Sequence, residues 1–540
     1  MTPIKKIFKA AAVVSAAALL ITGCSQTGGE AGGGAASPET INWTVRANNL
    51  FNGHFDPHKS QIDASEMIGR LSLDSLTYLD DKGELHPWLA KSWETSEDGK
   101  TVTFKLRDDV TFHDGEKFNA EAVKANFEHI MAEETDSAQA NLLLGGEAYE
   151  GTEVVDDYTV AVKFSRPNAP FLNNTSRASL GFYSPKALQA GQDKLSAGGA
   201  DVTVGTGPWK LTKLESGTSI SYERNADYKW APQGYDLSKN LAKQLEVSVV
   251  PDDELRVKRL SSGETDVVSE VTPNSADSVE EGLHSQPSPG IPYSYYLNQA
   301  NGHLADQKVR QALVLGANID EAVKAVYSDH VDRAWSALAP NTPNTTGDKL
   351  EGVNKFDRAR AEQLLDEAGW VRPADGVIRE KGGNKLELSY IAWTPRSDEN
   401  QTLSELLIAD WKEIGIDVKY EVLEPEQYNA LYEPGKYDIT DWGYSSTDAD
   451  ILRNHLHSEG FQNAPHVQDP EIDAKIDAAA ATFDAAERTR IYDELLQWNA
   501  DQVYILPIHQ NSKTTAVSSK VTGLEYDAFG YPQFFNVGKK

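Results

Sequence analysis

The stretch that decides the fold runs from residue 87 to residue 107 and reads PWLAKSWETSEDGKTVTFKLR. Its second half, residues 100–106, alternates polar and apolar side chains, with Val102, Phe104 and Leu106 on one face. A period of two is typical of a strand that buries one of its faces. The stretch therefore predicts a half-buried β-strand.

Strands and helices alternate along the rest of the chain. Residues 158–164 repeat the period of two, and Asn119 is a suitable N-cap for a helix with apolar side chains at helical spacing. Further on, a helix expected over residues 401–414 ends at Gly415 and leads directly into a strand that begins at Ile416. A helix, a glycine and a strand in this order form an α/β unit. The pattern predicts an α/β body with several sheets.

The N-terminal residues have the features of a secretory signal peptide. Three lysines precede an apolar run at residues 10–21, and small residues lead from it to Cys24, the only cysteine of the chain. The run is shorter than the roughly 20 apolar residues that a permanent transmembrane helix needs. We therefore predict that residues 1–23 are a cleaved signal peptide.

The sequence Ile21-Thr22-Gly23-Cys24 resembles the lipobox of bacterial lipoproteins. The resemblance implies that the thiol of Cys24 carries a diacylglycerol, which anchors the protein to the outer face of the cell membrane, in a periplasmic or extracellular position. The Gly-, Ala- and Ser-rich sequence that follows predicts a flexible tether, so that residues 24–39 hold the anchor and the tether. An ordinary signal peptide with an incidental cysteine is the alternative.

Composition narrows the possible partners. The chain has 540 residues, enough for more than one hydrophobic core, and carries 51 Lys and Arg against 82 Asp and Glu, a net charge of −31. Phosphate binding needs a basic stripe, so we expect no nucleic-acid partner. The acidic surface also disfavours adhesion to anionic lipids, which leaves the lipid anchor as the link to the membrane. With one cysteine the chain has no intramolecular disulfide bond.

The motifs of common enzymes are absent from the sequence. It contains no Gly-x-Ser-x-Gly elbow, no His-Glu-x-x-His and no phosphate-binding Gly-x-x-x-x-Gly-Lys-Ser/Thr. Residues 205–208, GTGP, begin like a dinucleotide-binding loop, but Pro208 and Trp209 interrupt it, and we interpret them as a tight turn that enters a strand. We expect no catalysis, no cofactor and no bound metal ion. Two pairs of histidines are expected to be structural or exposed: His54 with His58, and His455 with His457.

Aromatic residues in short segments after expected strands are candidates for ligand binding. Ligand-contacting loops of α/β folds lie there, and aromatic rings offer apolar walls with polar tips. Trp442 and Tyr444 are the strongest candidates, because Gly443 between them lets a ligand approach the backbone and because Asp448 and Asp450 follow closely. The other candidates are Tyr295, Trp393 and Arg396.

Several ordered stretches resemble the bacterial extracellular solute-binding proteins of family 5, the peptide-, nickel- and opine-binding group that serves ABC importers. The densest match joins residues 87–107 to VTFHDG at 110–115 and NAEAV at 119–123, in the order and at the spacing of the family signature. Shorter matches agree: GTGPW at 205–209, KVRQAL at 308–313, LLDEAGW at 364–370 and Tyr437-Asp438. The matches span nearly the whole mature chain, which is identified as a member of this family.

The resemblance implies an α/β fold of the two-lobed periplasmic-binding-protein type, hinged, with a ligand cleft between the lobes. Lobe I would comprise residues 40–76, 203–292 and 506–540, with residues 77–202 as an extra subdomain, and lobe II would comprise residues 293–505. A solute in the cleft would stabilise the closed form, which an ABC permease and its ATPase would then recognise.

One departure from the family pattern concerns the ligand. The resemblance implies that peptide-binding members place an aspartate three residues after the tryptophan matching Trp442, where it pairs with the ligand's α-ammonium group. Ser445 stands at this position here. A buried ammonium group needs a carboxylate partner, so Asp448 or Asp450 would have to pair with an amine-bearing ligand. Arg396 could bind a ligand carboxylate through two hydrogen bonds, with a solvated arginine as the alternative.

We therefore predict a monomeric, lipid-anchored substrate-binding protein of an ABC importer that captures short peptides. A metal chelate, an opine or another small amphipathic solute is the alternative ligand, suggested by Ser445 and the nearby His455. An exported enzyme or a surface adhesin is the remote alternative.

Overall fold

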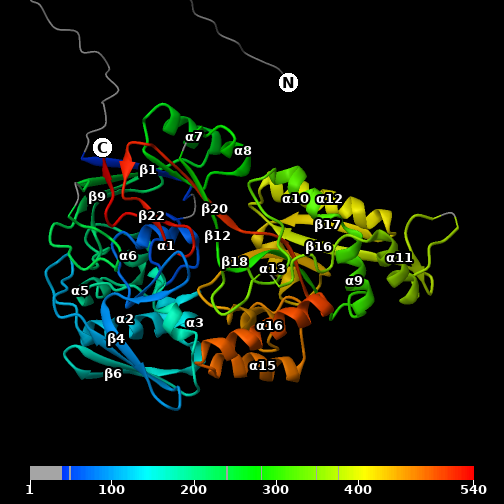
Figure 1. Ribbon diagram of the computed structural model, residues 1–540, viewed down its shortest axis with the longest axis horizontal. Helices are drawn as coiled ribbons and strands as arrows, with labels where there is room; N and C mark the ends of the chain where they lie inside the picture. Colours follow the sequence, from blue (N-terminus) through cyan, green and yellow to red (C-terminus); the bar gives the residue numbers. More distant parts are fainter. Residues whose placement is uncertain (1–38, 48–49, 239–240, 281, 348, 375) are drawn as a thin grey trace, which may run out of the picture. The chain divides into compact units, whose positions relative to one another are not determined.

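A computed structural model describes residues 39–47, 50–238, 241–280, 282–347, 349–374 and 376–540. The predicted signal peptide, Cys24 and the predicted tether up to residue 38 lie outside these ranges. The described residues from 39 to 540 form one compact unit that mixes helices with several β-sheets (Figure 1). In the described part of the chain no helix is both long enough and apolar enough to cross a membrane.

The largest sheet has seven strands in the order β12–β20–β11–β1–β10–β9–β8. Its central strand, β1 (Thr40–Val45), runs parallel to β10 (Gln244–Val249) and to β11 (Val267–Ser269). The outer strands pair antiparallel: β8 (Trp209–Glu215), β9 (Ser219–Arg224), β12 (Leu283–Pro287) and β20 (Ser512–Val517). This sheet and the four-stranded sheet of the next paragraph together build one part of the molecule, which we call lobe I.

The four-stranded sheet contains two strands from the stretch at residues 87–107. It is antiparallel throughout, and its strands in spatial order are β4 (Ala90–Thr95), β5 (Thr101–Leu106), β7 (Thr159–Phe164) and β6 (Tyr149–Asp156). Val102, Phe104 and Leu106 are buried, which confirms the predicted half-buried strand. Helix α2 (Ala120–Met131) begins at the predicted cap, because the Asn119 side chain accepts a hydrogen bond from the Ala122 backbone N–H.

The five-stranded sheet forms the core of what we call lobe II. Its strands in spatial order are β17 (Asp417–Leu423), β16 (Glu387–Trp393), β18 (Ile439–Ser445), β13 (Gly290–Leu297) and β19 (Ile505–His509). The predicted α/β unit is present as α12 (Asp398–Glu413) followed by β17. The helix begins earlier than expected, because the Ser397 side chain caps it, and Gly415 with φ +90° turns the chain into the strand.

The remaining elements are short or lie around these sheets. The helices are α1 (Asp63–Gly69), α3 (Ala140–Leu144), α4 (Phe171–Asn174), α5 (Pro185–Leu188), α6 (Gln192–Ala197), α7 (Asp253–Ser261), α8 (Pro273–Ala276), α9 (Gln307–Gly316), α10 (Ile319–Tyr327), α11 (Arg358–Glu367), α13 (Pro425–Tyr432), α14 (Ile451–Leu456), α15 (Pro470–Ala481) and α16 (Ala485–Gln502). The short 3-10 helices are η1 (Glu133–Thr135), η2 (Gly146–Ala148) and η3 (Ala178–Leu180). The two-stranded ribbons pair β2 (Thr77–Leu79) with β3 (Leu85–Pro87), β14 (Glu380–Lys381) with β15 (Asn384–Lys385), β21 (Val521–Thr522) with β24 (Gly538–Lys539), and β22 (Glu525–Tyr526) with β23 (Pro532–Gln533).

The GTGPW segment is a close backbone crossing that leads into β8. The Gly207 N–H donates to the Ser72 carbonyl at 2.9 Å, and the Trp209 N–H donates to the Leu71 carbonyl at 3.0 Å. A Cβ atom on Gly205 would lie 2.0 Å from the Ser72 carbonyl oxygen, so no side chain fits there. The segment enters a strand at Trp209 as predicted, but residues 206–208 form a bend that pairs with residues 71–72 and not a hydrogen-bonded turn.

The chain passes from one large sheet to the other through two short segments. β12 leads into β13 through residues 288–289, and β19 leads into β20 through residues 510–511. One backbone hydrogen bond of 2.7 Å joins the two segments. The expected boundaries after residues 292 and 505 fall inside β13 and at the start of β19, because these two strands pair with each other in lobe II.

Candidate ligand-binding site

A cavity of about 990 Å³ lies between the two lobes, and both lobes contribute to its wall. Lobe I supplies the segments that follow β1 and β11, and lobe II supplies the loop after β16 and the end of β18. Charged side chains of both signs line the wall: Arg46, Arg177, Arg396, Lys513, Asp63, Asp253, Glu254, Glu270, Asp398 and Glu399. A volume of this order accommodates a solute of several hundred daltons.

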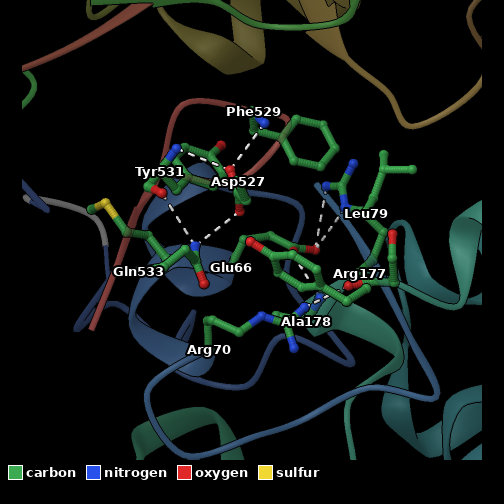
Figure 2. Close-up of a pocket in the computed structure, with 12 residues that line it drawn as sticks. Glu66, Arg70, Leu79, Arg177, Ala178, Asp527, Phe529, Tyr531 and Gln533 are labelled. Atoms are coloured by element: carbon green, nitrogen blue, oxygen red, sulfur yellow. Dashed lines mark hydrogen bonds and ion pairs between the residues drawn. The ribbon is translucent and has the colours of Figure 1, made fainter. Parts of the chain in front are cut away.

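Arg177 of lobe I is a buried cation of this wall, with its side chain 5% exposed. Its Nε and Nη2 lie 3.4 and 3.3 Å from Oε1 of Glu66, and its guanidinium group stacks over the ring of Phe529 (Figure 2). Glu66 is itself fixed by the backbone N–H groups of Ala178 and Ser179. The Nη1 atom of Arg177 is buried and has no hydrogen-bond partner within the protein, although its N–H groups can donate.

A second, much smaller cavity of about 20 Å³ lies beside Arg177 (Figure 2). Arg70 and Asp527 line it, and burial raises the pKa of Asp527 to about 6. Asp527 accepts hydrogen bonds from the backbone N–H groups of Phe529 and Tyr531. A space of this size holds about one water molecule, so this part of the structure supports Arg177 and does not bind a solute.

Arg396 of lobe II also lines the inter-lobe cavity, with its side chain 7% exposed. Its Nη1 donates to Asp441 at 3.0 Å, and its Nη2 donates to the hydroxyl groups of Tyr293 and Ser404, both at 2.8 Å. Only Nε lacks a partner. The alternative of a solvated arginine is wrong, because these groups hold the guanidinium group rigidly at the cavity wall.

Tyr444 and Ser445, two further predicted candidates, line the cavity from the end of β18. The Nε2 atom of Gln139, from lobe I, donates to the Tyr444 hydroxyl group at 3.0 Å. The Oε1 atoms of Gln139 and Gln510 are buried without a partner, and both residues belong to the cavity wall. The residues of the wall therefore include buried acceptors and buried N–H donors that have no hydrogen-bond partner within the protein.

Asp448 and Asp450 do not line the cavity. Asp448 is 2% exposed, and its two oxygens accept hydrogen bonds from Arg488 at 2.6 and 2.7 Å and from Asn173 at 3.0 Å. Asp450 accepts a hydrogen bond from the Tyr492 hydroxyl group, and burial raises its pKa. The expectation that one of them pairs with a ligand amine is wrong, because groups of the protein already occupy both carboxylates.

The three other aromatic candidates belong to the packing of lobe II and not to the cavity wall. Trp442 stacks on Tyr296 with ring centroids 4.1 Å apart, and its Nε1 donates to Nε2 of His455 at 3.2 Å. Trp393 is 43% exposed and lies parallel to Trp442, 6.1 Å away. Tyr295 is completely buried.

The histidines near these residues are poorly placed to bind a metal ion. Both ring nitrogens of His455 are engaged, by Trp442 and by a backbone carbonyl group, and burial lowers its pKa to about 4. Among the described residues, the ligand atoms of Asp80, Glu84 and His86 lie within 4.8 Å of one another. Asp80 accepts hydrogen bonds from His86 and from backbone N–H groups between β2 and β3, so this group stabilises a turn.

Sequence reasoning missed Gln139, Arg177 and Lys513, which line the cavity from three distant parts of lobe I. Lys513 pairs with Asp63 across the cavity wall. None of these residues lies in a motif or follows a periodic pattern in the sequence. Only the arrangement of the sheets brings them to one surface, so no local signal could have identified them.

Comparison with known proteins identifies the family. The family model described as bacterial extracellular solute-binding proteins, family 5 Middle, matches residues 84–463. The chain belongs to this family. This solute-binding protein is 28% identical over 518 residues to the nickel-binding periplasmic protein of Escherichia coli K12, covering 91% of this chain and 93% of that protein. It is also 28% identical over 483 residues to the dipeptide-binding protein of the same organism, and this match covers 84% of this chain and 86% of that protein.

A solved structure supports the same assignment. NikA from Brucella suis in complex with Fe(III)-EDTA has a TM-score of 0.79 and 27% identity, and the match covers 93% of this chain and 100% of NikA. The predicted family and the predicted two-lobed α/β fold with a cleft between the lobes are confirmed. The relatives are binding proteins of ABC importers and not enzymes.

Proposed function

We propose that this solute-binding protein captures a small solute that carries a carboxylate group, with short peptides as the first candidate, and delivers it to an ABC permease and its ATPase. The observation that carries the proposal is Arg177, a residue of the cavity wall that both lobes form, whose buried Nη1 atom has no hydrogen-bond partner within the protein. A guanidinium group fixed in this way binds a carboxylate with charge-assisted hydrogen bonds.

The unpaired groups of the wall favour a peptide over other carboxylates. Arg177 and Arg396 offer free N–H groups, whereas Gln139 and Gln510 offer free carbonyl oxygens. A peptide backbone has both acceptors and donors, so it satisfies both kinds of group, whereas a chelate of the EDTA type has acceptors alone. Carboxylates such as Glu270 also line the cavity and provide partners for an ammonium group.

An anionic metal chelate is the second candidate. No carboxylate of the loop from Trp442 to Asp450 lines the cavity, so this loop provides no partner for a ligand ammonium group. The similarity to the nickel-binding periplasmic protein of Escherichia coli and to NikA from Brucella suis supports the same candidate. In this case Arg177 binds a carboxylate of the chelator.

Thermal unfolding in the presence of defined solutes separates these candidates. A panel of di- and tripeptides is tested beside Ni(II)–histidine and Fe(III)-EDTA, each at about 100 times its dissociation constant. A genuine ligand then stabilises the protein by about 3 kcal/mol. Stabilisation by free peptides supports the first candidate, and stabilisation by chelates alone supports the second. If neither group raises the melting temperature, both candidates fail.

We further propose that the signal peptide is cleaved before Cys24, that Cys24 is lipidated and that residues 25–39 tether the body near its permease. A tether of this kind raises the effective concentration of the binder at the permease. We also propose the predicted division into two lobes, with the boundaries after residues 292 and 505 moved to the crossings at residues 288–289 and 510–511. Mass spectrometry of the N-terminal peptide from the native protein tests the anchor: an unmodified Cys24 contradicts it.

A further inference from the structure

Two segments from opposite lobes are hydrogen-bonded to each other outside the cavity wall. Asn173 and Asn174 end α4 in lobe I, and Thr447 and Asp448 follow β18 in lobe II. Thr447 Oγ1 donates to Asn174 Oδ1 at 2.9 Å, and Asn173 Nδ2 donates to Asp448 Oδ2 at 3.0 Å. None of the four residues lines the inter-lobe cavity. We call these four residues the clasp.

Each half of the clasp is held in place within its own lobe. On the lobe II side, Arg488 from α16 binds both oxygens of Asp448, at 2.6 and 2.7 Å, and both side chains are buried. On the lobe I side, the Nδ2 atom of Asn174 donates to the Leu143 carbonyl at 3.1 Å. The two halves are therefore preorganised for contact, which reduces the entropy lost when they meet.

Two further hydrogen bonds also join the lobes. At the cavity wall, Gln139 donates to the Tyr444 hydroxyl group. The Ala169 N–H donates to the Ala480 carbonyl at 2.9 Å. The contacts of the clasp exist only while the lobes are together, and the two-residue crossings are hinge points about which lobes of this kind rotate.

We propose that the clasp holds the two lobes together independently of any bound solute. It thereby sets the fraction of the protein whose lobes are together and competent to bind a solute. Water satisfies the same polar groups when the lobes part, so each hydrogen bond contributes modestly and the clasp biases the equilibrium without locking it. The apparent dissociation constant is the intrinsic one divided by the competent fraction. Because the clasp does not line the cavity, its loss weakens the binding of every solute by the same factor.

The distance between the lobes tests this proposal without any solute. Spin labels are placed at the exposed positions Glu97→Cys and Glu471→Cys in the full chain carrying Cys24→Ser, and distances are measured by double electron–electron resonance. The test variant combines Thr447→Val with Asn173→Ala. The matched control is Thr175→Val, because the Thr175 hydroxyl group is equally buried but bonds only within lobe I.

The test variant is expected to lower the ratio of short to long distances by about threefold or more, because the hydrogen bonds between the lobes are lost. The control is expected to keep the wild-type distribution. Asn173→Ala alone is the second variant, and it is expected to change the distance distribution less, in the same direction. It replaces the double variant in the test if the double variant does not fold. An unchanged distribution in the test variant, or an equal change in the control, overturns the proposal. Because no solute is needed, this result is separate from the outcome for the proposed function.

Discussion

At the scale of single residues, the sequence around Asp448 suggests a ligand-binding role, but the folded structure gives this carboxylate a structural role. Its position close to Trp442 and Tyr444 suggests contact with a ligand amine. In the structure both of its oxygens are bound by Arg488, and both side chains are buried. Spacing along the sequence does not specify where a side chain points once the strand has ended.

Replacing Asp448 with Asn is expected to destabilise the fold. The substitution leaves Arg488 buried without its counter-charge, and breaking a buried pair in this way costs about 3–5 kcal/mol. Urea unfolding measures the loss. The control is Asp108→Asn, whose partner Lys91 is exposed, and it is expected to leave the midpoint unchanged. A variant as stable as the wild-type protein would show that the ion pair contributes nothing to the fold.

Buried histidines are expected to make the protein sensitive to acid. Burial lowers the pKa of His58, His113, His455 and His509 from 6.5 to about 4. The unfolded chain takes up these protons near pH 6.5, whereas the folded protein takes them up only near pH 4. The contribution of these histidines to the free energy of unfolding is therefore complete above pH 6.5. It is lost as the pH falls towards 4, by up to about 3 kcal/mol for each group. Asp74 opposes this trend, because burial raises its pKa to about 7 and its contribution declines as the pH rises from 4 to 7.

The free energy of unfolding between pH 7 and pH 4 tests this expectation. His455→Gln removes one titrating group and keeps an acceptor for the Trp442 N–H, so its free energy of unfolding should change less steeply with pH than that of the wild-type protein. Parallel curves for the two proteins would show that His455 is not protonated preferentially on unfolding.

At the scale of single elements, the crossing at Gly205 and Gly207 makes a sharp prediction. A Cβ atom on Gly205 would lie 2.0 Å from a backbone oxygen of Ser72, whereas one on Gly302 would have no heavy atom within 4 Å. Gly205→Ala therefore forces the backbone apart and is expected to cost about 2 kcal/mol or more. Gly302→Ala is the matched control, expected to change the free energy of unfolding by less than about 0.5 kcal/mol. Equal stability of both variants would show that the crossing is not tightly packed.

Elements were predictable from sequence where local chemistry decides them. The period of two predicted the strand that contains Phe104, and the Asn119 side chain caps the helix it was expected to cap. The cavity wall was predictable only in part. Arg396, Tyr444 and Ser445 line it, but Arg177 and Gln139 reach it from lobe I segments that carry no pattern. Such residues are brought together by the packing of sheets, to which no local rule applies.

At the scale of the whole molecule, capture of a solute depends on its contact with both lobes. Arg177 of lobe I and Arg396 of lobe II line one cavity, and in the described part of the chain two short crossings connect the large sheets. A solute shifts the equilibrium between the two arrangements of the lobes only by the difference in its affinity for them. A ligand held by both lobes meets this condition, because it loses part of its contacts when they separate.

Whether Arg177 binds the carboxylate of the captured solute is measured by calorimetric titration of a short peptide and of its C-terminal amide into the wild-type protein and into Arg177→Lys. Lysine keeps the charge of Arg177 but not its fork of N–H groups. Amidation is expected to weaken binding to the wild-type protein by about tenfold or more, and to weaken binding to Arg177→Lys by no more than about threefold. An equal loss in both proteins, or no loss in the wild-type protein, would contradict the claim that Arg177 binds the carboxylate of the captured solute.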